Sequence, residues 1–291
     1  GNMKRAIIKG LCLGCIFALA LMILSAVMNQ GNTDMTTEME EATYPVLSMY
    51  VGNYRVGSLH GYAQNMESAY LRDNLQPVGE DRKIDVRIDT YGREIDTIGF
   101  EVRSLDGERL VESTPVEEYE KEDDTITFAI TLKDLIENDT EYMLVFLVTP
   151  KGSAPVRYYS RIVLSDSLHI QEKLDYISDF HERTFDREAA AELTKYLESN
   201  AEGDNTTFNR VTIHSSFNQV TWGDLLVRRG ADARIIIREL TEQTGSFNIV
   251  YLVSIKNGKQ TDYYRVKEYY RVRYTPDRMY LLDFEREMNQ I

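Results

Sequence analysis

The chain has 291 residues and a formal net charge of −14, with 33 basic residues against 47 acidic ones. This surplus of acid excludes a protein that binds nucleic acid or an anionic lipid surface through its overall charge. Its 19 tyrosines, beside 10 phenylalanines and one tryptophan, favour strand-rich structure because aromatic side chains are enriched in β-strands.

An uncharged run, GLCLGCIFALALMILSAVM, covers residues 10–28. A helix needs about 20 residues to cross the hydrocarbon core of a bilayer, so the run predicts one transmembrane helix. Lys4, Arg5 and Lys9 precede the run and an acidic segment follows it. The positive-inside rule then predicts a single-pass membrane protein with a cytoplasmic tail at residues 1–9 and its bulk outside the cell. A cleaved signal peptide is the alternative, although the run is longer than a usual signal core.

Both cysteines of the chain, Cys12 and Cys15, lie inside this run with C-x-x-C spacing. Such spacing elsewhere indicates redox or metal chemistry, but in lipid the two residues are expected to be small apolar fillers. A lipoprotein signal ending at Cys15 is discounted, because the apolar stretch before it is too short. Residues 29–43, NQGNTDMTTEMEEAT, are polar and lack helical periodicity, so they are expected to form a stalk.

Between residues 44 and 165 short segments of alternating apolar residues are separated by turns. The predicted strands are residues 45–51, 83–90, 95–104, 109–112, 125–132, 141–149 and 156–164. Asp106 and Gly107 form the strongest kind of short hairpin signal. Short strands at this spacing predict a β-sandwich domain over residues 44–165.

One motif in this region resembles a known family. The segment IENDTEY at residues 136–142 precedes the apolar run MLVFLV. It is similar to the segment before the sixth strand of fibronectin type III domains, although Asn138 stands where that family usually has proline. The resemblance implies an immunoglobulin-like sandwich in which the hydroxyl of Tyr142 bonds to the backbone a few residues upstream. Other immunoglobulin-like sandwiches fit almost as well.

Residues 53–81 are too many for a plain hairpin connection. They carry four candidate binding residues, His60, Tyr62, Tyr70 and Arg72. One interpretation is a binding loop on a rigid scaffold. The commoner alternative is a strand at 54–58 followed by a short helix at 65–72 that closes one end of the sandwich.

From residue 166 the pattern changes to helical spacing. One helix is predicted from Leu168 to Phe180, and a second over residues 186–199 with Asp186 as its N-cap. The strands expected after them are residues 208–214, 233–241, 246–256, 260–275 and 278–287. Helices followed by antiparallel strands predict an α+β domain over residues 166–291. This order of elements resembles the cone-shaped nuclear-transport-factor-like fold.

The strand at residues 260–275 places basic side chains on one face. They are Arg265, Lys267, Arg271 and Arg273. This stripe suits an anionic polymer such as a wall glycan, but the next strand is acidic. If Tyr274 pairs with Tyr280 across the intervening turn, Arg271 faces Asp283 and Lys267 faces Glu287. Cross-strand charge pairs would then neutralise the stripe.

Other candidate sites are weaker. Trp222, the only tryptophan, either stacks on a sugar ring or is a core or lid residue. His181 and Glu182 begin like a zinc-protease motif, but Phe185 stands where the second histidine belongs. The sequence therefore predicts no catalytic residue, no cofactor and no metal site.

As a whole the chain resembles membrane-anchored envelope proteins of Gram-positive bacteria. The leading hypothesis is a membrane-tethered, extracytoplasmic binding or scaffold protein of a bacterial envelope, with the membrane and either an envelope protein or a wall glycan as partners. One alternative is an envelope sensor or regulator with a ligand pocket in the α+β domain. A cell-wall enzyme is a further alternative, but it requires acid–base pairs that the sequence does not display.

Overall fold

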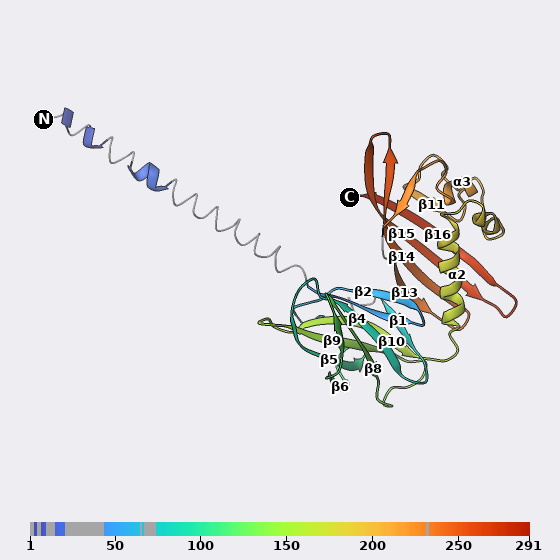
Figure 1. The fold of residues 1–291 in the computed structure, drawn as a ribbon, viewed down its shortest axis with the longest axis horizontal. Helices are drawn as coiled ribbons and strands as arrows, with labels where there is room; N and C mark the ends of the chain where they lie inside the picture. The colour runs from blue at the N-terminus through green and yellow to red at the C-terminus, as the bar shows by residue number, and fades with distance from the viewer. Residues whose placement is uncertain are drawn as a thin grey trace. The chain divides into compact units, whose positions relative to one another are not determined.

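The computed structural model describes residues 3–4, 7–9, 15–20, 44–64, 66, 74–230 and 233–291. The chain divides into two units, Gly1–Tyr44 and Pro45–Ile291. The second unit consists mostly of β-strands in two sheets, with few helices (Figure 1).

The smaller sheet has five strands in the order β3-β10-β9-β5-β6. Their bounds are Leu75–Val78 for β3, Val156–Leu164 for β10, Glu141–Pro150 for β9, Ile95–Ser104 for β5 and Leu110–Val116 for β6. Strands β3 and β10 run parallel, and the other neighbours are antiparallel. The predicted strands at 95–104 and 156–164 have the observed bounds, whereas β3 was not predicted.

The larger sheet has eleven strands in the order β11-β16-β15-β14-β13-β2-β1-β4-β8-β7, and β12 pairs with β14 beside this path. Its first strands in the chain are β1 at Val46–Val51, β2 at Tyr54–Leu59, β4 at Lys83–Asp89, β7 at Glu120–Glu122 and β8 at Thr125–Thr131. Its later strands are β11 at Arg210–Thr212, β12 at Val227–Arg229, β13 at Arg234–Leu240, β14 at Thr244–Asn257, β15 at Gln260–Tyr274 and β16 at Met279–Gln290. A parallel pairing of Ile235 with Val56 joins the two groups of strands.

The two sheets pack on each other through apolar side chains of the alternating strands. Phe128 of β8 meets Phe146 of β9 edge to face, with ring centroids 6.3 Å apart. Phe146 and Tyr158 of the smaller sheet and Leu47 and Met49 of the larger one are fully buried. A β-rich, two-sheet arrangement is compatible with the predicted β-sandwich. The helix predicted at 65–72 lies outside the described residues, apart from Met66.

The predicted tyrosine contact is present. The hydroxyl of Tyr142, at the start of β9, accepts a hydrogen bond from the backbone N–H of Glu137 at 3.0 Å. Tyr142 is buried, with 5% of its surface exposed. Its hydroxyl therefore fixes the chain just before β9 to that strand.

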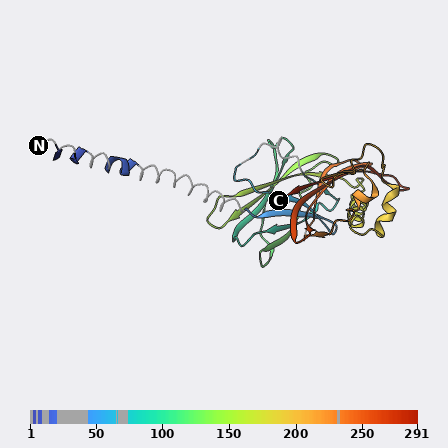
Figure 2. The same ribbon diagram turned by 90° about the horizontal axis from the view of Figure 1, so that it is seen from above.

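Helix α2, Ile170–Arg183, lies across one face of strands β13 to β16 (Figure 1 and Figure 2). Its apolar face buries Leu174, Ile177 and Phe180. The Phe180 ring lies 5.6 Å from that of Tyr270 on β15 and 5.1 Å from that of Phe284 on β16. The helix is thus held to the sheet by large aromatic side chains, each about 1% exposed or less.

Lys173 fixes the first turn of α2. Its buried ammonium group donates to the backbone carbonyl oxygens of Leu168, Thr241, Glu242 and Thr244 at 2.6 to 3.1 Å. Three of these carbonyls belong to the turn after β13 and the first residue of β14. One buried cation therefore ties the start of the helix to a hairpin of the sheet.

The second predicted helix is wrong in length and type. In place of a helix over residues 186–199, the structure has a 3-10 helix at Ala189–Lys195. The N-cap of this helix is Glu188 rather than the predicted Asp186, although the carboxylate of Asp186 accepts from the backbone N–H groups of Glu188 and Ala189. The helix ends early because the N–H of Glu198 donates to the carbonyl of Ile213. This N–H therefore forms a strand-like contact in place of a helical one.

The structure also corrects the predicted fold class of a transmembrane helix, an all-β sandwich and an α+β domain. The described chain is mostly β, with α3, Phe217–Val220, as its only α-helix besides α2 after residue 44. Because the second helix is a short 3-10 helix, the order of elements no longer matches a nuclear-transport-factor-like cone. The domain boundary near residue 165 stays a prediction, since strands from both sides of it share the larger sheet.

The membrane helix at residues 10–28 is part of this correction. No helix among the described residues is both long and apolar enough to cross a membrane. The helical residues described before residue 44 are 3–4, 7–9 and 15–20, and the rest of the predicted span and the stalk at 29–43 lie outside the described residues. Helix α2, the longest helix among the described residues, has 14 residues and carries charged side chains, against the roughly 20 apolar residues that a span requires.

The Tyr142 contact generates the first prediction. Replacing Tyr142 with phenylalanine should lower the free energy of unfolding by about 1 kcal/mol, because the N–H of Glu137 loses its acceptor. Urea unfolding followed by circular dichroism measures this change. Tyr263→Phe is the matched control, since Tyr263 is 58% exposed; equal unfolding midpoints for both variants would contradict the structural role of the hydroxyl.

Candidate functional site

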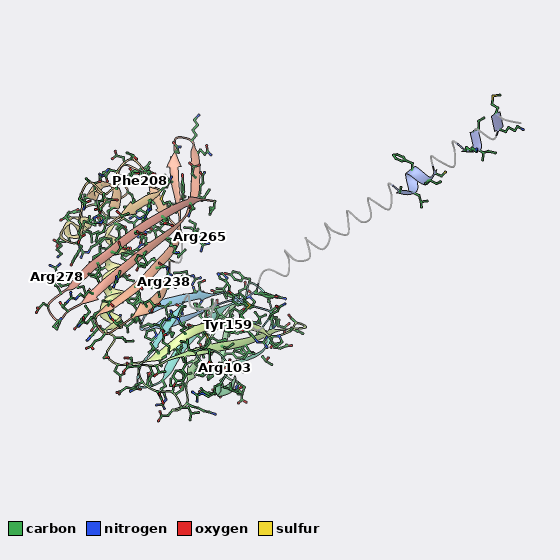
Figure 3. The ribbon with its side chains drawn as sticks, turned by 180° about the vertical axis from the view of Figure 1, so that it is seen from behind. Arg103, Tyr159, Phe208, Arg238, Arg265 and Arg278 are labelled. Atoms are coloured by element: carbon green, nitrogen blue, oxygen red, sulfur yellow. The ribbon has the colours of Figure 1, made fainter. Side chains whose placement is uncertain are left out.

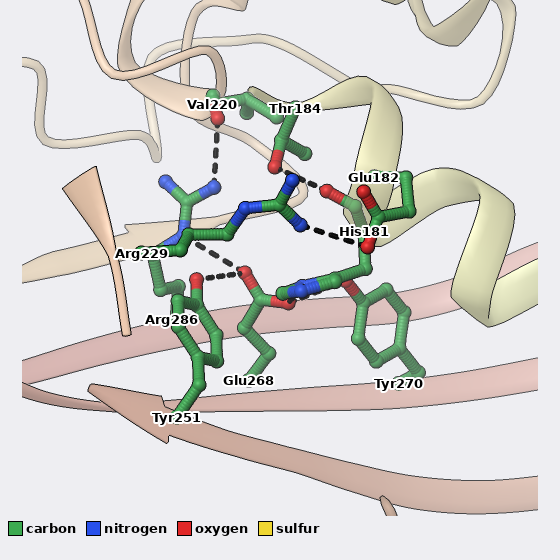
Figure 4. A network of polar contacts seen from close by, with 9 residues as sticks. All are labelled: His181, Glu182, Thr184, Val220, Arg229, Tyr251, Glu268, Tyr270 and Arg286. Carbon is green, nitrogen blue, oxygen red and sulfur yellow. Dashed lines mark hydrogen bonds and ion pairs between the residues drawn. The ribbon is translucent and has the colours of Figure 1, made fainter. Parts of the chain in front are cut away.

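A buried carboxylate, Glu268 on β15, is the centre of a polar network beneath α2 (Figure 4). Its Oε1 atom lies 2.5 Å from Nδ1 of His181 and accepts from the hydroxyl of Tyr270 at 2.8 Å. Its Oε2 atom accepts from the hydroxyl of Tyr251 at 2.8 Å and from Nε of Arg286 at 3.1 Å. Four donors thus surround one carboxylate, and Nδ1 of His181 must carry a proton to donate to it.

The strand alternation places these side chains. On β15 the inward positions are Val266, Glu268, Tyr270 and Val272, all buried. Arg286 on β16 is the direct cross-strand partner of Glu268, and it has no exposed surface. His181 comes from the last turn of α2, on the same buried face as Phe180.

The network controls the ionisation of its members. Burial raises the pKa of Glu268, but the contacts of His181, Arg286 and Tyr251 outweigh it and lower the pKa from 4.5 to about 2. Burial, followed by the negative charge of Glu268, raises the pKa of Tyr251 and of Tyr270 well above the usual 10. The carboxylate is therefore ionised and both phenols are neutral near pH 7, which suits a structural ion pair rather than proton transfer.

Arg286 extends the network toward the surface. Its Nη atoms donate to the backbone carbonyls of Gln219 and Val220 at 3.4 and 2.7 Å. Its guanidinium lies 3.9 Å from the ring centroid of Trp222. Trp222 stacks on Phe185 at 5.4 Å, and the guanidinium of Arg229 lies 4.3 Å from the Phe185 ring. A stack of two cations and two aromatic rings thus leads from the core to the surface.

A pocket of about 700 Å³ opens at the outer end of this stack. It is formed by the chain after α2, the turn after α3, and β12. Its described lining residues are Phe185, Arg187, Thr221, Trp222, Gly223, Leu225, Val227, Arg228, Arg229 and Gly230. They include three arginines, two aromatic residues and no acidic residue. On a chain as acidic as this one, the pocket is a local concentration of positive charge.

The turn that carries Trp222 has an uncommon backbone. Trp222 and Gly223 have φ angles of +68° and +54°, in the left-handed region that costs a residue with a side chain about 1–2 kcal/mol. A Cβ atom at Gly223 would lie 2.7 Å from the Phe208 ring. Strain of this kind persists only where surrounding contacts hold it, and it is frequent at binding sites.

The arginines of the pocket differ in their partners. Arg229 forms an ion pair with Glu182 at 2.7 Å. Arg187 donates to the side-chain oxygen of Asn218, which carries no charge. Within the described part of the chain, neither Arg187 nor Arg228 has a carboxylate within 4 Å. Two guanidinium groups are therefore available to an anion.

The structure separates the other candidate residues. His60 is exposed, and Tyr62 packs edge to face on Tyr159 with centroids 6.0 Å apart. Tyr70 and Arg72 lie outside the described residues. Trp222 is 3% exposed, as a core or lid residue is, yet it borders the arginine pocket. Of the predicted binding-loop residues, the two that are described, His60 and Tyr62, are thus not brought together with Trp222.

Arg265, Arg271 and Arg273 are exposed on the face of β15 opposite α2. The predicted neighbours are present, because Arg271 pairs with Asp283 and Lys267 with Glu287. The turn was predicted incorrectly. Tyr274 pairs with Met279 rather than Tyr280, and a bulge next to Arg271 restores the register.

The sequence reasoning missed Glu268, Arg286 and the pocket arginines. A usable signal was present for the first two, since Glu268 alternates in phase with Val266 and Tyr270, and Arg286 with Phe284 and Met288. A charged residue at an inward position of two neighbouring strands indicates a buried ion pair. The pocket arginines gave no such signal, because Arg187 is distant in sequence from Arg228 and Arg229.

In the described residues no group of three His, Cys, Asp or Glu side chains is placed to hold a metal ion. A comparison of the sequence with known protein families finds no match, and a comparison with curated proteins finds none either. The pocket and the network are therefore interpreted from their own geometry.

The low pKa of Glu268 generates a second prediction. The folded state keeps this carboxylate ionised down to about pH 2, whereas the unfolded chain takes up a proton near its ordinary value of 4.5. Its stabilisation is therefore complete above pH 4.5 and is lost as the pH falls toward 2, by about 3 kcal/mol in all. Glu268→Gln should lower the free energy of unfolding by about 3–5 kcal/mol at pH 7, because Arg286 stays buried without its partner.

Urea unfolding at several pH values between 2 and 7 measures both effects. The difference between the native chain and Glu268→Gln should shrink as the pH falls through this window. Glu287→Gln, on the exposed face of the same sheet, is the control and should show no such trend. A difference that stays constant with pH would contradict the depressed pKa of Glu268.

Proposed function

We propose that the chain is a binding protein rather than an enzyme, and that its arginine pocket takes an anionic ligand with a planar apolar group. The observation that carries this proposal is the lining of the pocket. Three arginines, Arg187, Arg228 and Arg229, lie beside the rings of Phe185 and Trp222, and none of the described lining residues is acidic. Guanidinium groups bind carboxylate or phosphate oxygens bidentately. Aromatic rings supply an apolar, stacking surface.

Burial and size support a ligand at this place. A volume of about 700 Å³ is within the usual range for small-molecule pockets, about 300–1,000 Å³. The indole N–H of Trp222 is buried and has no hydrogen-bond partner in the described part of the chain. An unpartnered buried donor costs about 1–3 kcal/mol, so a ligand oxygen that accepts from it adds to the affinity.

The space directly beneath α2 is a poor alternative. Phe180, Tyr270 and Phe284 fill it with rings that are about 1% exposed or less, and the carboxylate of Glu268 has all its donors in place. A catalytic role would need a reacting group that a substrate reaches, and Glu268 has no exposed surface. These observations favour binding at the edge of the sheet.

For residues 44–165 we infer an immunoglobulin-like sandwich. The pairing of β4 with β8 in one sheet and the order β10-β9-β5-β6 in the other support it, since that family divides its strands between two sheets in this way. The hydroxyl of Tyr142 bonded to the backbone of Glu137 adds a second feature of the family. The proposed role of this part is to carry the binding region, in the extracytoplasmic setting that the sequence predicts.

Phenyl phosphate is a suitable probe, because it combines an anion with one ring. Its binding to the full chain should change the fluorescence of Trp222, the single tryptophan, which borders the pocket. Arg228→Gln should weaken binding about tenfold, the loss expected for one charge-assisted contact of about 1.4 kcal/mol. Added salt should weaken it further.

Arg265→Gln is the matched control, since it removes the same charge from an exposed residue on the opposite face. Inorganic phosphate and benzyl alcohol should bind more weakly than phenyl phosphate, because each offers half of the contacts. Equal affinities for Arg228→Gln and Arg265→Gln, or no fluorescence change at all, would contradict the proposal.

A further inference from the structure

A second hollow lies on the outer face of the larger sheet, opposite α2. It has a volume of about 230 Å³ and is lined by Arg238, Asn248, Lys267, Tyr269, Glu285 and Glu287. These residues come from four neighbouring strands, β13 to β16. Figure 3 shows this side of the sheet, with Arg238 and Arg265 labelled on it. The alternation of β15 points Lys267 and Tyr269 away from the buried Glu268, so the hollow is independent of the arginine pocket.

Strand register aligns its polar groups in rows. Asn248, Tyr269 and Glu285 are direct partners across β14, β15 and β16. Lys267 and Glu287 form the adjacent cross-strand pair. The ladder between β13 and β14 shifts between Ile237 and Glu239, which leaves Arg238 as the bulged residue. A bulge re-aims a side chain and is common next to functional sites.

Asn248 gives the hollow an unused hydrogen-bonding group. The residue is 5% exposed, and its Oδ1 atom is buried with no hydrogen-bond partner in the described part of the chain. Buried amides are nearly always hydrogen-bonded, so an unpartnered one in a hollow indicates a ligand that bonds to it. The amide oxygen is an acceptor, so the ligand must offer it a donor.

The charges of the lining cancel. Arg238 and Lys267 are balanced by Glu285 and Glu287, unlike the arginine pocket, which has three bases and no acid. No ion pair within 4 Å joins these four side chains to one another in the described structure, and the ion pair of Glu285 is with Arg210 at 3.5 Å. The hollow therefore offers many donors and acceptors but no net attraction for an anion or a cation.

We infer that this hollow binds one ring of a neutral sugar. Hydroxyl groups donate to the carboxylates of Glu285 and Glu287 and accept from Arg238 and Lys267. A hydroxyl can also donate to Oδ1 of Asn248. The half-buried ring of Tyr269 gives the apolar C–H face of a sugar a surface to pack on. A hollow of 230 Å³, below the usual range for drug-sized ligands, matches a single ring, with any further rings in solvent.

Saturation-transfer NMR on the full chain, with glucose, galactose and N-acetylglucosamine as separate probes, tests this inference. At least one sugar should receive saturation, and its affinity should fall about tenfold in Tyr269→Ala, because the ring contact is lost. Tyr263→Ala is the matched control, since Tyr263 lies on the same strand and face but outside the hollow; it should bind like the native chain. Glu287→Gln, an exposed and conservative change, should also weaken binding without affecting the urea unfolding midpoint.

Three results would overturn the inference. The first is no saturation transfer to any of the three sugars. The second is an equal loss in Tyr269→Ala and Tyr263→Ala, or no loss in either. The third is displacement of the sugar by phenyl phosphate, which would assign the sugar to the arginine pocket. Sugar binding that persists in Arg228→Gln separates this site from the proposed anion site, so either proposal can fail alone.

Discussion

The buried carboxylate of Glu268 is the interaction on which the C-terminal half of the structure depends. Moving an ionised carboxylate out of water costs several kcal/mol, and the fold offsets this cost by placing four donors around it. Those donors come from α2, β14, β15 and β16, so one charge fixes a helix against three strands. Removing one partner leaves the others buried and unpaired, and the network is therefore cooperative rather than a sum of separate contacts.

The same constraint shapes the surface pocket. Arg286 must remain against Glu268, and its two Nη atoms donate to the carbonyls of Gln219 and Val220. These contacts hold the turn in which Trp222 and Gly223 adopt left-handed angles. The ion pair of Arg286 and Glu268 thus helps to hold this strained turn in place. The turn places Trp222 against Phe185, whose ring also contacts Arg229. The buried ion pair thus positions the two aromatic rings of the arginine pocket, although no residue of the pocket is near Glu268 in sequence.

Local signals were sufficient for much of the strand pattern and insufficient for the helices and the sheet order. Ile95–Ser104 and Val156–Leu164 could be located because period-two alternation is a property of the segment itself. The helix expected after Asp186 failed because the N–H of Glu198 bonds to Ile213, a contact that propensity does not report. The parallel pairing of Val56 with Ile235 joins segments far apart in the chain, and no turn residue between them marks it. The ion pair of Glu268 and Arg286 was accessible in principle, as two charges in phase with apolar neighbours.

The two hollows differ in the charge of their lining residues, and this difference argues for separate ligands. With a net charge of −14, the chain repels polyanions at long range, so an anion binds only where a local cluster of arginines exceeds that field. The arginine pocket meets this condition because Arg187 and Arg228 have no acidic partner within 4 Å in the described residues. On the opposite face of the sheet, Glu287 and Asp283 lie across from Lys267 and Arg271 and offset these two charges of the basic stripe of β15. Nearby opposite charges weaken the attraction for an anionic polymer but leave the hydrogen-bonding groups in place. Those groups suit a neutral, hydroxyl-rich ligand.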